Sequence, residues 1–132
     1  GTEHYRNVQR HNVITYPSIV SLRVDESLYF ANSNYLESCV YQVIAENREV
    51  EHVILQCTAV NEIDLSALEA LEAINFRLNE QGLTLNLSEV KGPVMDALKR
   101  TDFLDHLSGS VYLSHHQAVE QLKPEVIEPY II

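Results

Sequence analysis

The chain has 132 residues, of which 45% are hydrophobic and 21% are charged, and its formal net charge is −10. This length and composition fit one globular domain with its own hydrophobic core, and they exclude a disordered chain. Only nine Lys and Arg residues are present, and they are scattered rather than clustered. Nucleic acid is therefore excluded as a partner, and the negative charge disfavours acidic lipid surfaces.

No apolar run approaches the roughly 20 residues that span a bilayer, and residues 1–12 lack the apolar core of a signal peptide. We therefore expect the chain as given to be soluble. It does not begin with Met, and we expect it to be a segment cut from a longer protein. Its two cysteines, Cys39 and Cys57, show no metal-site spacing. We interpret them as reduced core residues of a cytosolic protein.

The first third of the chain predicts a linker, two or three strands and a helix. Residues 1–12 show no clear period and are interpreted as a linker. β patterns at residues 13–16 and at Ile19–Val24 are separated by Pro17 and Ser18, which suggests a hairpin. Tyr29 and Phe30 are candidates for a short third strand. A helix should then begin at the cap-type residues 32–34 and end near residue 47.

The rest of the chain alternates between strand and helix patterns. An apolar run at residues 53–55 is typical of a strand covered on both faces. Apolar residues at helical spacing then follow and predict a helix, which Gly82 should stop. Residues 83–88 predict a strand, Gly92 and Pro93 a helix start, and residues 111–113 a last strand. The stripe expected to face the sheet comprises Leu68, Leu71, Ile74 and Leu78. Ser114 and Gln117 form a capping-box pattern before a final helix.

This order of elements predicts an α/β fold with a mainly parallel sheet, because strand–helix alternation requires crossover connections. The initial β pair should add an antiparallel edge, which makes the sheet mixed. We place the domain at residues 13–122, after the linker at 1–12 and before a loose C-terminal tail at 123–132. No repeat or internal linker divides the chain.

The sequence offers few signs of catalysis. The four glycines are too far apart for a phosphate-binding loop, and no serine lies in a nucleophile-elbow motif. His115 and His116 are adjacent, so on a helix they point about 100° apart and are poor joint metal ligands. The many carboxylates are spaced like solvated helix faces. We therefore predict no enzyme activity, no cofactor and no metal.

One segment combines a helix start with a modifiable side chain. Asp64 is a natural N-cap, and Ser66 would lie in the first helical turn, where free backbone N–H groups could accommodate a phosphate. The alternative interpretation is an ordinary Asp cap followed by a small helix-start serine. We expect burial of Leu65 and Leu68 to hold this helix in place, so that phosphorylation would change partner binding without unfolding the domain.

Residues 64–68, Asp-Leu-Ser-Ala-Leu, resemble the D-x-S/T-G/A-L signature of the STAS family, named for sulfate transporters and anti-sigma factor antagonists. The resemblance implies that Ser66 is a regulatory or phosphorylation site. Leu65 and Ala67 stand where antagonists commonly have Ser and Gly. It also implies a recognition surface at the helix cap and its flanking loop, which comprises Asn61, Glu62, Asp64, Leu65, Ala67 and Leu68.

Two flanking segments resemble the transporter branch, the SulP or sulfate permease family. Residues 1–8 resemble the GT-x-x-YR-[DN]-V segment that joins the membrane part of SulP transporters to their STAS domain. Residues 22–32 resemble the early transporter strands, with a turn formed by Tyr29, Phe30, Ala31 and Asn32. The implied fold is a STAS-like mixed, mainly parallel sheet with about four helices packed largely on one side.

The resemblance implies a non-catalytic cytoplasmic regulatory domain of an anion transporter in the inner (plasma) membrane. Its partners would be the membrane portion of the same transporter, a second copy of the domain, or a soluble regulatory protein. The alternative is a free-standing anti-sigma factor antagonist switched by phosphorylation of Ser66. The linker-like residues 1–8 favour the transporter, because a free antagonist has no need of them. A small-molecule sensor is a third hypothesis, which the lack of a phosphate-binding loop disfavours.

Overall fold

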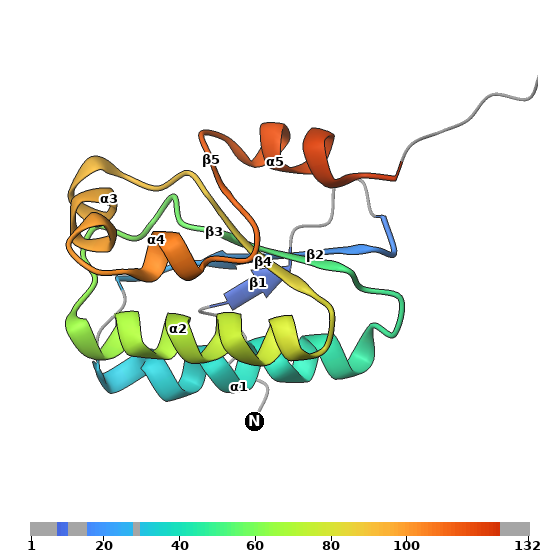
Figure 1. Cartoon of the computed structure of the whole chain (residues 1–132), viewed down its shortest axis with the longest axis horizontal. Helices are drawn as coiled ribbons and strands as arrows, with labels where there is room; N and C mark the ends of the chain where they lie inside the picture. The colour runs from blue at the N-terminus through green and yellow to red at the C-terminus, as the bar shows by residue number, and fades with distance from the viewer. Residues whose placement is uncertain (1–7, 11–15, 28–29, 125–132) are drawn as a thin grey trace, which may run out of the picture.

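Five strands form one sheet in the order β1–β2–β3–β4–β5 in the computed structural model, which describes residues 8–10, 16–27 and 30–124 (Figure 1). β1 pairs antiparallel with β2, and every other pair is parallel. The strands are β1 (Val8–Arg10), β2 (Ile19–Val24), β3 (His52–Gln56), β4 (Thr84–Ser88) and β5 (Val111–Tyr112). The predicted mixed, mainly parallel sheet is therefore confirmed.

The first strand lies earlier in the chain than the sequence predicted. β1 occupies Val8–Arg10, inside the segment that we interpreted as a linker, and its register pairs Val8 with Val24 and Arg10 with Leu22. A backbone ladder on a sheet edge needs no alternating apolar side chains, so three residues without a period can form it. Of the expected strand at 13–16, residues 13–15 lie outside the described residues and Tyr16 is not in a strand.

The first helix also begins earlier than expected. α1 (Phe30–Glu46) starts where we predicted a third strand at Tyr29 and Phe30, which is wrong for Phe30, and Tyr29 lies outside the described residues. The cap-type residues 32–34 are instead inside the helix. The helix ends near residue 47, as predicted. At that end the side chain of Asn47 donates a 2.6 Å hydrogen bond to the carbonyl oxygen of Val43.

Helices α1 and α2 (Leu65–Glu80) lie side by side along one face of the sheet (Figure 1). The predicted apolar stripe of α2 faces the sheet, since all four of its residues are buried. The helix stops as predicted at Gly82, which has a φ of 76°. A glycine adopts this left-handed conformation without steric cost. The following N–H, from Leu83, donates to the carbonyl oxygen of Leu78 at 2.9 Å.

The central strands are buried on both faces. Three neighbouring residues of β2, β3 and β4 point into the core between the sheet and helices α1 and α2. They are Val20, Val53 and Leu85. Asn86, on the other face of β4, is fully buried. Its Nδ2 donates to the carbonyl oxygen of Val53 at 3.2 Å, and its Oδ1 accepts from the N–H of Ser110 at 2.9 Å. These bonds satisfy the amide and connect three neighbouring segments.

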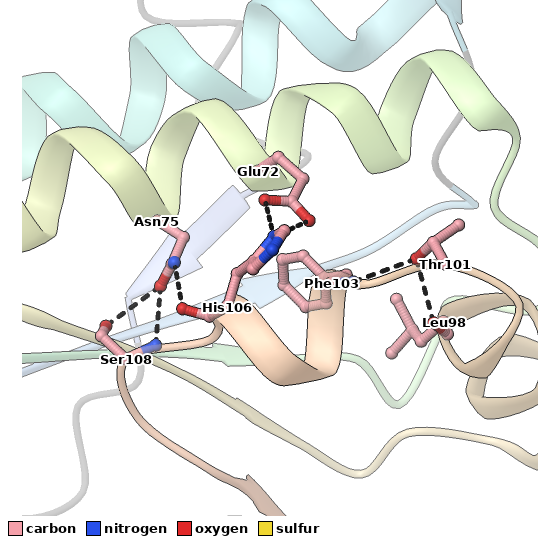
Figure 2. A network of polar contacts seen from close by, with 7 residues as sticks. All are labelled: Glu72, Asn75, Leu98, Thr101, Phe103, His106 and Ser108. Atoms are coloured by element: carbon pink, nitrogen blue, oxygen red, sulfur yellow. Dashed lines mark hydrogen bonds and ion pairs between the residues drawn. The ribbon is translucent and has the colours of Figure 1, made fainter.

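After β4 the chain forms α3 (Gly92–Lys99) and α4 (Phe103–His106), and α4 was not predicted. Figure 2 shows how α4 is attached to α2. Asn75 of α2 donates to the carbonyl oxygen of His106 at 2.9 Å and accepts from the N–H of Ser108 at 2.9 Å. His106 Nδ1 lies 3.1 Å from both carboxylate oxygens of Glu72. The described part of the chain thus holds five helices, where about four were predicted.

The last helix, α5 (His115–Leu122), lies on the opposite face of the sheet from α1 and α2, where Ala118 is fully buried (Figure 1). The Ser114 half of the predicted capping box is confirmed, because its Oγ accepts from the N–H of Gln117 at 3.0 Å. The side chain of Gln117 accepts from the N–H of Leu113 at 2.9 Å rather than from that of Ser114. Among the described residues, α1 and α4 each pack against α2, and α5 lies across the sheet from them, so the helices lie largely on one side. No helix in the described part of the chain is long and apolar enough to cross a bilayer.

Candidate functional site: the loop before α2

The loop between β3 and α2, residues 57–64, leaves the carboxyl end of β3. We call it the β3–α2 loop. Because β2, β3 and β4 are parallel, the segments that follow these strands all emerge at one edge of the sheet. Open α/β sheets place their binding sites at this edge. Side chains from the segments after β2 and β4 contact the loop there.

Ser27, from the segment after β2, holds the β3–α2 loop. Its Oγ accepts hydrogen bonds from the backbone N–H groups of Asn61 and Glu62, each at 3.2 Å. Its carbonyl oxygen accepts from Nδ2 of Asn32 at 2.8 Å. Ser27 therefore joins the predicted recognition loop to Asn32, the last residue of the family-motif turn. Of that turn, Tyr29 lies outside the described residues, while Phe30 and Ala31 open α1.

Lys91, from the segment after β4, binds the loop from the other side. Its Nζ donates a 2.6 Å hydrogen bond to Oδ1 of Asn61. This contact brings a cation to a loop that carries the exposed Glu62. Neither Ser27 nor Lys91 was singled out from the sequence. Only the order of the strands, which brings these segments together, could have pointed to them.

The predicted N-cap of α2 is confirmed. Asp64 has an extended backbone, with φ −93° and ψ 173°, and its Oδ1 accepts from the N–H of Ala67 at 2.9 Å. Ser66 lies two residues later, in the first turn, and is partly exposed. The remaining N–H groups of this turn and the positive end of the helix dipole lie close to its hydroxyl.

The exposure of these residues divides the predicted recognition surface in two. Asn61 and Glu62 are exposed, and the side chain of Leu65 is 65% exposed. Ala67 and Leu68 are buried against the core. The expected burial of Leu65 is therefore wrong, because Leu65 points away from the sheet while Ala67 and Leu68 point towards it. The helix start is held by the Asp64 cap and by these two buried residues.

Loss of this cap should destabilise the domain measurably. Asp64→Ala removes the acceptor for the Ala67 N–H and should lower the free energy of unfolding by about 0.5–2 kcal/mol. Asp64→Asn keeps an acceptor of similar reach and should recover most of that loss. Urea titrations of both variants measure the effect. Equal stability of Asp64→Ala and the wild type would show that the cap does not stabilise α2.

Both cysteines are buried, Cys57 at the start of the β3–α2 loop and Cys39 in α1. Burial raises the pKa of Cys57 to about 12 and also raises the pKa of Cys39. Each thiol is therefore protonated at neutral pH, and the thiolate is the form that reacts. We predict negligible labelling of either cysteine by a disulfide reagent in the folded protein and full labelling in denaturant. Rapid labelling under native conditions would contradict this burial.

Within the described residues, no group of three or more His, Cys, Asp or Glu side chains could hold a metal ion. The site instead offers a rigid loop, an exposed leucine and a helix N-terminus.

The STAS domain family model matches residues 10–118, which include every element from β2 to the start of α5. The chain belongs to the STAS domain family.

Sulfate transporters are among the relatives of this STAS domain. It is 33% identical over 128 residues to sulfate transporter 3.1 of Arabidopsis thaliana, with 88% of this chain and 20% of that protein covered. It is 27% identical over 137 residues to sulfate transporter 1.3 of the same plant, with 96% and 21% covered. This STAS domain therefore spans about a fifth of the length of these relatives.

Solved structures share the fold of this STAS domain. A sulfate transporter family protein of Wolinella succinogenes has a TM-score of 0.72 at 22% identity, with 82% of this chain and 87% of that chain covered. A murine anion transporter of solute carrier family 26 has a TM-score of 0.71 at 21% identity, with 82% and 18% covered. The unphosphorylated anti-sigma factor antagonist SpoIIAA has a TM-score of 0.70 at 11% identity, with 87% and 95% covered.

Proposed function

We propose that this STAS domain is a non-catalytic regulatory and interaction domain of a SulP-family anion transporter. It would lie on the cytoplasmic side of the plasma membrane and act through contacts with the membrane portion of the same protein. The observation that carries this proposal is the alignment of nearly the whole chain with about a fifth of each sulfate transporter. The remaining length of those proteins corresponds to the part that would transport the anion.

The β3–α2 loop and the first turn of α2 are the surface through which the domain would act. Hydrogen bonds from Ser27 and Lys91 fix the loop, while Leu65 remains exposed beside Ser66. A fixed loop loses little conformational entropy when a partner binds, and an exposed leucine offers apolar area to bury. These features support recognition at this surface.

Phosphorylation of Ser66 would regulate that surface. A phosphate at a helix N-terminus gains roughly 0.3–1 kcal/mol from the dipole. It would also add about −1.5 to −2 charge beside Glu62 and Asp64. Because Ala67 and Leu68 remain buried beneath the helix start, the added charge should change partner contacts without unfolding α2.

Transport by the full-length protein tests this role. Ser66→Glu introduces a negative charge at the first turn and should change transport, or binding to the membrane portion, relative to Ser66→Ala. Gln121→Glu is the matched control, because it adds the same charge to an exposed position of α5 on the other face of the sheet. All three variants should fold. Wild-type transport and binding in both Ser66 variants would leave Ser66 as an ordinary helix-start residue.

The alternative function is a free-standing antagonist of an anti-sigma factor. The gene distinguishes the two functions. Several hydrophobic stretches of roughly 20 residues encoded upstream of residue 1 would support the transporter. A start codon at that position would support the antagonist, and Ser66→Glu should then abolish binding to a kinase-like anti-sigma factor.

A further inference from the structure

The outward side of α2 carries two large apolar side chains. Leu65 and Phe76 are 65% and 66% exposed. They are 11 residues apart, which is close to three helical turns, so they point in nearly the same direction about 16 Å apart. The buried stripe through Leu71 and Ile74 lies on the opposite side of the helix. The two exposed side chains therefore mark a line along the helix that residues 8–10, 16–27 and 30–124 leave uncovered.

Carboxylates accompany these two apolar residues. At 100° per residue, three glutamates of α2 lie within about 60° of Leu65 around the helix axis. We call this side the α2 stripe, which comprises Leu65, Glu69, Glu72, Phe76 and Glu80. Glu69 and Glu80 are exposed, whereas Glu72 bonds to His106 (Figure 2). The α2 stripe thus combines apolar anchors with negative charge.

The cation of α2 does not neutralise the α2 stripe. The guanidinium of Arg77 lies 4.0 Å from the centroid of the Tyr41 ring, which places it on the side of α2 that faces α1. A cation stacked on an aromatic ring in this way gains about 0.5–1 kcal/mol at an exposed site. The domain as a whole carries a net charge of −10. The α2 stripe should therefore attract a basic partner and repel an acidic one.

The negative charge of the α2 stripe and the composition of each candidate partner indicate which partner would bind there. A second copy would bring an equally acidic stripe against this one, and like charges across an interface are unfavourable. Anionic lipid headgroups are repelled for the same reason. The cytoplasmic loops of membrane proteins are instead enriched in Lys and Arg. A basic loop with one or two apolar side chains would match both the carboxylates and the two anchors of the α2 stripe.

We propose that the α2 stripe docks a Lys/Arg-rich cytoplasmic loop of the membrane portion of the same protein. The proposal rests on the proposed function, since it requires that membrane portion. It extends the contact from the first turn of α2 along the length of the helix.

Photo-crosslinking in the full-length protein tests this proposal. p-Benzoylphenylalanine placed at Phe76 should crosslink to a Lys/Arg-rich cytoplasmic loop, which mass spectrometry of the digested product identifies. The matched control position is Leu113, which is 89% exposed but lies after β5, away from α2. It should give no crosslink to that loop. A product formed with a second copy of the domain, with a soluble protein or with lipid alone would overturn the proposal, as would the absence of any product.

Reversing the charge of two glutamates of the α2 stripe provides a second test of the proposal. Glu69→Lys combined with Glu80→Lys should lower the crosslink yield at position 76 roughly fivefold or more, because attraction becomes repulsion. Glu49→Lys with Glu51→Lys makes the same change in net charge at exposed positions before β3 and should leave the yield unchanged. Equal losses in both pairs would show that only overall charge matters and would overturn the proposal.

The transport assay with the Ser66 variants distinguishes failure of the docking proposal from failure of the proposed function. If Ser66→Glu changes transport and position 76 forms no crosslink to a loop, only the docking at the α2 stripe fails. If the gene encodes no membrane span, the proposed function itself fails.

Discussion

Leu71→Ala should lower the free energy of unfolding by about 2–5 kcal/mol. Leu71 lies in the middle of α2 and is 2% exposed, packed in the cluster between the helices and the sheet. Truncation removes apolar contacts and leaves a cavity that the neighbouring side chains cannot close, because α2 is fixed at both ends. The Asp64 cap holds one end and Gly82 the other.

A denaturant titration measures this loss. Phe76→Ala is the matched control on the same helix, because its side chain is 66% exposed and its truncation creates no cavity. It should change the stability by no more than about 0.5 kcal/mol. A loss well under 1 kcal/mol for Leu71→Ala would show that the apolar stripe does not pack against the sheet.

Gly109→Ala should destabilise the domain by about 1–3 kcal/mol, the range expected for overpacking. A methyl group at this position would overlap with Oδ1 of Asn86 and with the carbonyl oxygen of Leu85. Neither can move cheaply. Asn86 is fully buried with its amide bonded to Val53, and the Leu85 carbonyl accepts the N–H of Gly109 at 3.0 Å.

Gly92→Ala is the control for this glycine. A methyl group there meets no atom within 4 Å, and the position lies at the start of α3. Alanine reduces the freedom of the unfolded chain, so Gly92→Ala should be neutral or stabilising by up to about 1 kcal/mol. Thermal unfolding compares the two variants. A Gly109→Ala protein as stable as Gly92→Ala would show that the segment before β5 can move away from β4.

Local signals explain what the sequence could predict. The Asp64 cap, the apolar stripe of α2 and the Gly82 stop all lie within a few residues of the structure they specify, and all three are confirmed. The helix cap at Ser114 is confirmed for the same reason. Such signals act through backbone groups three or four residues away, so no knowledge of the fold is needed to interpret them.

The features that the sequence missed depend on distant parts of the chain. β1 exists because β2 offers a free edge, not because residues 8–10 have a strand pattern. The one-sided burial of the helix start, with Leu65 outward, depends on how α2 is rotated against the sheet. Of the candidate site, Asp64 was found through its cap. Ser27 and Lys91 reach the loop from segments 34 and 30 residues away from Asn61.

The order of strands in the sheet bears on how the chain folds during synthesis. Each strand pairs with the one that precedes it in the sequence, so none has to be inserted between two strands that are already paired. The sheet can therefore extend one strand at a time as the polypeptide leaves the ribosome, with β5 added last at the open edge. Each parallel addition closes only one helical crossover, because the paired strands are consecutive in the sequence. New strands therefore join at a single growing edge, while β1 remains the other edge of the sheet, and this limits the opportunity to aggregate before the chain is complete.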